Sequence, residues 1–276
     1  MTWPRLRAAA AGEAAGLRVP MPAGPGCCPV CRGPSGEGYP RCFSCCLHHR
    51  SAPGLLADAV VPLSYSIAGT AYSRWLRAYK SASADRHEAR AAMRTLLLVF
   101  LHDHGSCLWA SAGMTAPSHA AVVPSGCGRM GVHPLRALIE PYLALPWAGL
   151  VACAGDPVQS RELRLGRYRS ASSLRGASVL LLEDTWASGA SAQSAAAALK
   201  LAGAASVLTL VFGRHVNTER LHFDTFLRSL SQSYFRLDRC AVHAMPPSIP
   251  GPFPRSRPAL GAPPGAAVST AGRPGM

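Results

Sequence analysis

Short, mostly apolar runs alternate with amphipathic stretches through the middle of the chain. Runs of this length are typical of strands buried on both faces, and they lie at residues 60–65, 119–124, 149–153, 179–182 and 206–212. Apolar positions three or four apart predict helices over residues 70–80, 85–102, 189–200 and 218–230, and one that opens at 133–135. This alternation predicts an α/β fold, in which a mostly parallel, twisted sheet carries helices on both faces.

The remaining segments differ in composition from this α/β region, which we place at residues 55–243. Residues 1–26 are rich in Ala, Gly, Pro and Arg without periodicity, so we expect a disordered arm. Residues 27–50 are rich in cysteine and predict a small zinc-ribbon-like module. Residues 244–276 are dominated by Pro, Gly and Ala, which predicts a disordered tail.

Composition narrows the classes of partner. Lys and Arg outnumber Asp and Glu by 28 to 14, and the resulting net charge of +14 suits phosphorylated substrates or nucleic acid. No apolar run reaches the length of a membrane span and no signal peptide is recognisable, so we expect a cytoplasmic protein without a membrane partner. In a reducing compartment, the ten cysteines favour metal binding or free thiols over disulfides.

Two Cys-x₂-Cys pairs lie close together near the N-terminus. They are Cys28 with Cys31 and Cys42 with Cys45, separated by ten residues. Each pair aims two thiolates at one ion, so the two pairs together predict a tetrahedral Zn²⁺ site. Four thiolates leave no position for water, and the predicted role is therefore structural. So short a segment would depend on the metal for much of its folding free energy.

Other residues could join or replace these ligands. Cys27 and Cys46 adjoin the two pairs and are alternative thiolates, with His48 and His49 as weaker alternatives. A further pair, Cys240-x₂-His243, has metal-ligand spacing but no second pair nearby in the sequence. It would either join a distant ligand or bind no metal.

The most informative stretch spans residues 178–191. An apolar strand is followed by Glu183 and Asp184 and then by a loop of small residues that opens a helix. The first helical turn carries no acid, and its free N–H groups with the hydroxyls of Ser188 and Ser191 form a suitable phosphate site. The two carboxylates could hold sugar hydroxyls or a hydrated Mg²⁺. A phosphorylated ribose that carries a metal-bound pyrophosphate would satisfy all of these groups.

This stretch resembles the signature of type I phosphoribosyltransferases that binds phosphoribosyl pyrophosphate (PRPP). The resemblance implies that Glu183 and Asp184 are catalytic acids that contact the ribose hydroxyls. It also implies that a five-residue loop wraps the 5′-phosphate of PRPP, namely Ala187, Ser188, Gly189, Ala190 and Ser191. Ala187 departs from the pattern because it lacks a hydroxyl. With the cysteine-rich module, residues 28–215 resemble the ComF family, which is associated with competence and DNA uptake.

The same resemblance assigns roles to two more loops. Glycines that allow close backbone approach, followed by an arginine fork, imply a pyrophosphate loop at Ser125, Gly126, Gly128 and Arg129. A mobile loop that closes over the substrate is implied at Arg161, Arg164 and Arg167, with a solvated basic linker or a nucleic-acid contact as the alternatives.

Two further positions leave alternatives open. Tyr79 and Lys80 resemble a Lys-Tyr turn of the family in reversed order, although Lys80 would equally suit a helix-end cation. Trp186 would either pack beneath the phosphate loop or cover a substrate ring.

These features lead to one preferred function and two alternatives. The preferred function is transfer of phosphoribose from PRPP to a nitrogen acceptor with Mg²⁺ and release of pyrophosphate. One alternative is a non-enzymatic module for DNA uptake, with single-stranded DNA or a helicase-like competence partner; the other is a PRPP sensor. No Gly-x-Gly-x-x-Gly or Gly-x₄-Gly-Lys-Ser/Thr motif supports a dinucleotide or P-loop site, and no motif identifies the acceptor.

Overall fold

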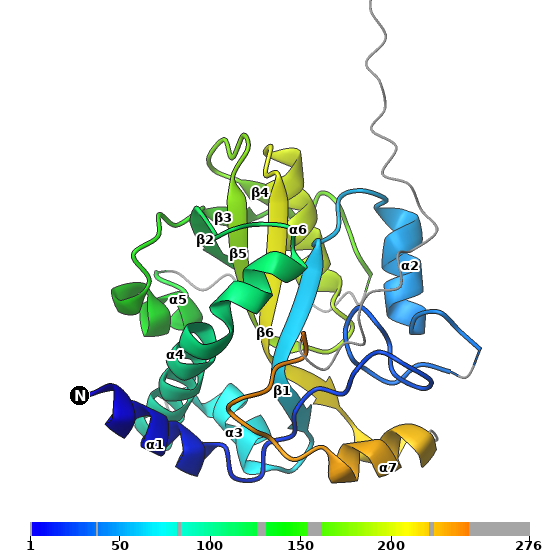
Figure 1. Cartoon of the computed structure of the whole chain (residues 1–276). Helices are drawn as coiled ribbons and strands as arrows, with labels where there is room; N and C mark the ends of the chain where they lie inside the picture. Colours follow the sequence, from blue (N-terminus) through cyan, green and yellow to red (C-terminus); the bar gives the residue numbers. More distant parts are fainter. Residues whose placement is uncertain are drawn as a thin grey trace, which may run out of the picture. The chain divides into compact units, whose positions relative to one another are not determined.

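The computed structural model describes residues 2–36, 38–81, 84–125, 131–153, 162–220 and 224–242. Within these residues the chain forms a parallel sheet that carries helices on both faces (Figure 1). The predicted fold class is therefore confirmed. The predicted tail at residues 244–276 lies outside the described part of the chain.

The main sheet contains four strands in the order β1-β6-β5-β2, and every pairing is parallel. Their bounds are β1 Ala59–Ile67, β2 His119–Val122, β5 Ser178–Trp186 and β6 Ser206–Val216. Alternate residues of the central strand β5 pack on opposite faces: Leu180 and Leu182 lie in one apolar core, Val179 and Leu181 in the other. This double burial explains the continuous apolar run that marks the strand in the sequence.

Helices cover both faces of the sheet. On one face lie α3 (Ala71–Ala78) and α4 (Arg86–Ser111), which share a core with Leu180 and Leu182. On the other lies α6 (Ala190–Leu201), against which α2 (Phe43–Ser51) packs. The smaller helical elements are α5 Pro134–Ile139, the 3₁₀ turns Glu140–Tyr142 and Thr218–Arg220, and α7 Asp224–Gln232.

The apolar run at residues 149–153 forms a strand outside the main sheet. It contains β3 (Leu150–Ala152), which pairs antiparallel with β4 (Tyr168–Ser170) in a separate two-stranded sheet. Val151 and Ala152 are exposed, unlike the strands of the main sheet. The pair places Tyr168 and its neighbour Arg167 close to the start of α6.

The prediction of a disordered arm at residues 1–26 is wrong. Residues Trp3–Glu13 form helix α1, which packs along α4 (Figure 1). Alanine is the best helix former, and its small side chain lets Ala10 lie fully buried in the core. An ion pair of 2.7 Å between Arg7 and Asp103 also joins α1 to α4. The low complexity of this segment therefore did not reveal its Ala-rich helix. Packing against α4, rather than an amphipathic pattern, stabilises that helix.

The described residues include no helix that combines the length and the hydrophobicity needed to cross a membrane.

Candidate functional site

The acid pair of the signature lies within strand β5. The strand continues to Trp186, beyond the predicted end at residue 182, so Glu183 pairs with Val211 and Thr185 with Gly213 of β6. Both carboxyl groups are half-buried. Pairing with β6 therefore holds the backbone of the two acids more rigidly than a loop would.

Tyr79 and Lys80, at the end of α3, meet Asp184. The Tyr79 hydroxyl donates to Oδ2 of Asp184 at 2.6 Å, and Nζ of Lys80 donates to the same oxygen at 2.8 Å. The side chain of Asp184 is only 12% exposed, so both contacts are shielded from solvent. A charge-assisted bond and a phenol bond hold one carboxylate oxygen in place. Lys80 is therefore not merely a solvated helix-end cation.

Glu183 has a different electrostatic environment. Burial, and secondarily the charge of Asp184, raises the pKa of Glu183 to about 8. The N–H group of Thr185 donates to Oε1 of Glu183 at 3.5 Å and offsets part of this rise in pKa. The two adjacent acids thus differ in environment: Tyr79 and Lys80 hold Asp184, whereas burial raises the pKa of Glu183.

This difference predicts that Glu183→Gln stabilises the protein at alkaline pH. Because the folded-state pKa is raised, the carboxyl contributes its full stability below the unfolded-state pKa of about 4.3 and loses it as pH rises through about 8. Thermal unfolding should therefore show a higher melting temperature than wild type at pH 9 and little difference at pH 5. Glu140→Gln, at a surface ion pair with Arg136, should show no alkaline gain. Equal destabilisation by Glu183→Gln at both pH values would contradict this assignment.

The loop after β5 makes a tight entry into α6. Gly189 has a φ of 84°, and a Cβ placed there would lie 2.1 Å from the Trp186 ring. Trp186 is only 1% exposed and packs beneath the loop, so it does not cover a substrate ring. The hydroxyl of Ser188 accepts a hydrogen bond of 3.3 Å from the N–H of Ala190, the first residue of α6. The predicted strand, loop and helix are thus all present.

The residues of the predicted phosphate loop differ in exposure. Ala187 is exposed, Ser188 is half-buried, and Gly189 and Ala190 are buried. Ser191 lies in the first turn of α6, where its hydroxyl accepts a hydrogen bond of 3.2 Å from Arg167.

The predicted mobile loop is described only in part. Arg167 is 6% exposed, and besides Ser191 its guanidinium contacts the carbonyl of Glu162 at 3.2 Å. Arg164 has an exposed side chain, and its backbone N–H donates to Ser194 at 3.0 Å. Arg161 lies outside the described residues. Of the two predicted arginines that are described, Arg167 is the one whose side chain contacts the predicted phosphate loop.

A cleft of about 220 Å³ joins several of these groups. The predicted site residues that line it are Ser125, Glu183, Asp184 and Ser191. Gly126, Gly128 and Arg129 of the predicted pyrophosphate loop lie outside the described residues. Lys80 and His133 also line the cleft, and the sequence analysis assigned no role to His133. Its Nδ1 accepts from the N–H of Leu135 at 3.2 Å and so caps α5, for which the only sequence signal is a His-Pro pair at a helix start.

The four predicted metal ligands form one cluster. The Sγ atoms of Cys28, Cys31, Cys42 and Cys45 all lie within 4.8 Å of one another. Tetrahedral Zn–S bonds of about 2.3 Å separate sulfurs by about 3.8 Å, and Cys31 and Cys42 lie 3.7 Å apart. The cluster could therefore hold a metal ion, and its donor set and spacing suit zinc.

The alternative ligands have other surroundings. Cys27 contacts the carbonyl of Met21 and Cys46 that of Arg41, at 3.9 and 3.7 Å between sulfur and oxygen. Neither His48 nor His49 belongs to the described cluster. Burial lowers the pKa of His48 to about 4. Among the described residues, the two Cys-x₂-Cys pairs are thus the candidate ligands of this cluster.

Arg214 of β6 connects this cluster to the loop after β5. Its guanidinium is buried beside Gly33, where an added Cβ would lie 2.0 Å from Nη2. It also donates to the carbonyl of Trp186 at 3.1 Å. Burial alone would lower the pKa of Arg214, but the nearby Cys31 thiolate raises it. The sequence carried no signal for this residue, because only the tertiary fold brings its three neighbours together.

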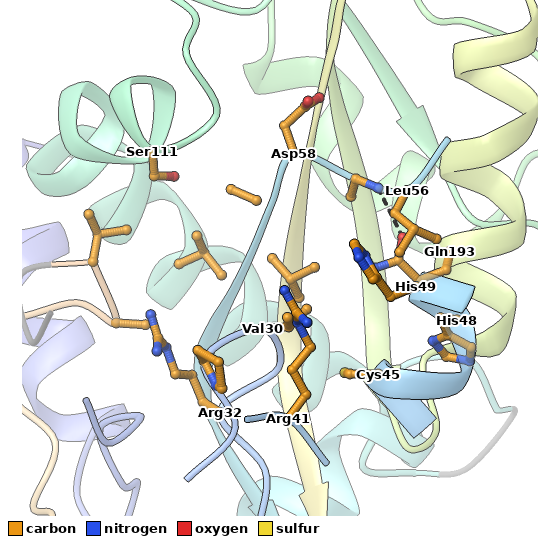
Figure 2. Close-up of a pocket in the computed structure, with 17 residues that line it drawn as sticks. Val30, Arg32, Arg41, Cys45, His48, His49, Leu56, Asp58, Ser111 and Gln193 are labelled. Atoms are coloured by element: carbon orange, nitrogen blue, oxygen red, sulfur yellow. Dashed lines mark hydrogen bonds between the residues drawn. The ribbon is translucent and has the colours of Figure 1, made fainter. Parts of the chain in front are cut away.

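A second pocket, of about 270 Å³, lies between the cysteine-rich module and the main sheet (Figure 2). It is lined by the guanidinium groups of Arg32 and Arg41, the imidazoles of His48 and His49, and the carboxyl group of Asp58. Gln193 of α6 lies beside His49 in the same pocket, and it accepts a hydrogen bond of 2.9 Å from the N–H of Ala57. Among the described residues, none lines both this pocket and the cleft that contains the acid pair, so the two are separate.

Comparison with known proteins identifies no family. No protein-family model matches the chain, and no curated protein matches it. Two crystal forms of a hypoxanthine phosphoribosyltransferase from Staphylococcus aureus align with it, each at 12% identity over 47% of this chain. The alignments cover 76% and 75% of those chains, with TM-scores of 0.29 and 0.28. Similarity at this level does not establish a relationship. The described residues themselves define an α/β protein with an acid-lined cleft and a Cys₄ cluster.

Proposed function

We propose that this protein binds PRPP with Mg²⁺ in the acid-lined cleft and transfers phosphoribose to a nitrogen acceptor. The observation that carries the proposal is the position of Asp184. Tyr79 and Lys80 hold one of its oxygens, while Glu183 and Ser191 line the same cleft. Acids for a ribose thus lie beside the start of a helix suited to a phosphate.

In the proposed reaction the acceptor nitrogen forms a bond to C1 of the ribose. The bond between C1 and the pyrophosphate oxygen breaks, its electron pair leaves with pyrophosphate, and the acceptor releases a proton to solvent. Glu183 and Asp184 would hold the ribose hydroxyls and stabilise positive charge on the ring. Mg²⁺, bound with PRPP, would neutralise the leaving group, and carboxylate oxygens are ligands that it prefers.

The 5′-phosphate would bind at the start of α6. The N–H of Ala190 already donates to Ser188, so the N–H groups of the first turn beyond Ala190 would donate to the phosphate, together with the hydroxyls of Ser188 and Ser191. Arg167, which already contacts Ser191, is placed to add positive charge. Ala187 removes one hydroxyl that the resemblance would supply, whereas the backbone donors do not depend on the side chain.

The test is calorimetric titration of PRPP with Mg²⁺ into wild-type protein and Asp184→Asn. Loss of a charged hydrogen-bonding partner is worth about 1.5–3 kcal/mol, so affinity should fall roughly 10- to 100-fold. Asp238→Asn removes an exposed carboxylate paired with Arg236 and should bind like wild type. If wild type does not bind PRPP, neither transfer nor sensing of PRPP is the function.

Two alternatives share parts of this structure. A PRPP sensor would need the same cleft, so pyrophosphate release with a panel of nitrogenous bases separates sensor from enzyme. The ComF-like alternative is DNA handling, and the basic pocket of Figure 2 is the feature that favours it. Strong, salt-sensitive binding of single-stranded DNA by a protein without PRPP affinity would support that alternative.

A further inference from the structure

Three side chains of metal-binding types meet outside the Cys₄ cluster. His104 and Cys107 lie one turn apart on α4 and therefore on one face of the helix. Cys240 reaches them from the segment after α7. Their ligand atoms all lie within 4.8 Å of one another, although more than 130 residues separate Cys107 from Cys240 in the sequence.

The surroundings of His104 suit a metal ligand. Its Nε2 lies 2.9 Å from the carbonyl of Leu237, an acceptor, so Nε2 carries the proton and Nδ1 the lone pair. Metal-binding histidines are commonly held in this way, with one ring nitrogen donating to a carbonyl. The imidazole is 2% exposed, and Phe100 packs at 5.0 Å between ring centroids.

The two thiols complete a donor set of one nitrogen and two sulfurs. Cys240 is fully buried and Cys107 is half-buried. The thiol of Cys107 lies 3.1 Å from the carbonyl of His104, a contact that it would give up on losing its proton to a metal. Borderline-soft donors of this kind favour zinc over magnesium or calcium.

We propose that His104, Cys107 and Cys240 bind a second zinc ion, which fastens the segment at residues 233–242 to α4. Three ligands leave one tetrahedral position for water or a further group. His243 follows Cys240 at metal-ligand spacing, but it lies outside the described residues, so we base the site on three ligands. The proposal is independent of PRPP binding, since none of these residues lines the acid-lined cleft.

Few backbone hydrogen bonds hold the segment at residues 233–242 in place. Residues 233–242 form no helix or strand beyond an isolated bridge between Arg18 and Tyr234. Two backbone bonds, Val19 to Ser233 at 2.9 Å and Phe235 to Leu17 at 3.3 Å, join its first part to the N-terminal region. A metal at Cys240 would anchor its far end, where Leu237 and Ala241 pack against the core.

The test is the zinc content of the whole protein, purified under reducing conditions and measured by elemental analysis. Wild type should contain two zinc ions per chain, and Cys240→Ser and Cys107→Ser should each contain one. Cys153→Ser removes a half-buried thiol outside both clusters and should retain two. Cobalt reconstitution of Cys45→Ser should show a thiolate-to-cobalt band that disappears when Cys240→Ser is added.

Several outcomes would overturn the proposal. One is a single zinc ion in wild type that Cys240→Ser leaves in place, and another is two ions that survive both substitutions. A disulfide between Cys107 and Cys240, detected by thiol titration without reductant, would replace the metal by a covalent link. Circular dichroism checks that each variant folds. If Cys240→Ser does not fold, the zinc content of Cys107→Ser, which changes the less buried thiol, provides the test.

Discussion

Replacing Cys45 by serine should remove metal from the Cys₄ cluster and strongly destabilise the protein. Loss of a structural metal belongs with the largest single-residue effects, about 5 kcal/mol, which corresponds to about 10–20 °C in melting temperature for a domain of this size. The reason is that the module has little else to fold around: among its described residues, the buried apolar side chains are three of the ligands, Cys28, Cys31 and Cys45, together with Cys27. Zinc analysis with thermal unfolding measures both effects.

Cys46→Ser is the matched control, because Cys46 follows Cys45 directly and lies outside the cluster. It should retain the metal and unfold within about 2 °C of wild type, as a change away from buried features does. Equal melting temperatures for the two variants would show that the cluster has no structural role.

Cys45→Ser should also weaken PRPP binding, although no cysteine lines the cleft. Arg214 connects Gly33 of the module to the carbonyl of Trp186, which lies beneath the phosphate loop. If the module unfolds, Arg214 loses one wall of its buried site, and the loop loses a fixed support. Retained PRPP affinity in metal-free protein would show that this connection does not position the loop.

The sequence predicted those features that depend on local pattern. The strand before Glu183 is marked by a continuous apolar run because both faces of β5 are buried. The Cys₄ cluster could be predicted because each Cys-x₂-Cys pair forms its own turn, so only one long-range encounter was needed. The loop into α6 was likewise contained in one stretch.

Features that depend on tertiary encounter were missed or left open. Tyr79 and Lys80 reach Asp184 from about 105 residues away, and neither residue type marks such a contact. Cys240 had metal-ligand spacing in the sequence, but its neighbours on α4 emerge only when the segment after α7 folds back. Composition misled at α1, since the same alanines favour a disordered arm by complexity and a helix by propensity.

Gly189→Ala should disable the proposed phosphate loop. Its φ of 84° places alanine in the left-handed region, at a cost of about 1–2 kcal/mol. The new Cβ would also lie 2.1 Å from the Trp186 ring, which is buried and cannot move aside freely. Overpacking of this kind adds about 1–3 kcal/mol, and relief by displacement of the loop would remove the donors to the phosphate. Urea unfolding and PRPP titration should therefore both show a large loss.

Gly176→Ala separates the two causes. Gly176 has a similar φ of 74°, but an added Cβ there meets nothing within 4 Å. It should therefore show only the backbone cost of about 1–2 kcal/mol and bind PRPP like wild type. If Gly189→Ala were no more harmful than Gly176→Ala in either measurement, the packing of Trp186 against the loop would have no part in forming the site. A larger loss of stability and of PRPP affinity in Gly189→Ala than in Gly176→Ala would instead show that the packing of the loop against the Trp186 ring positions the first turn of α6.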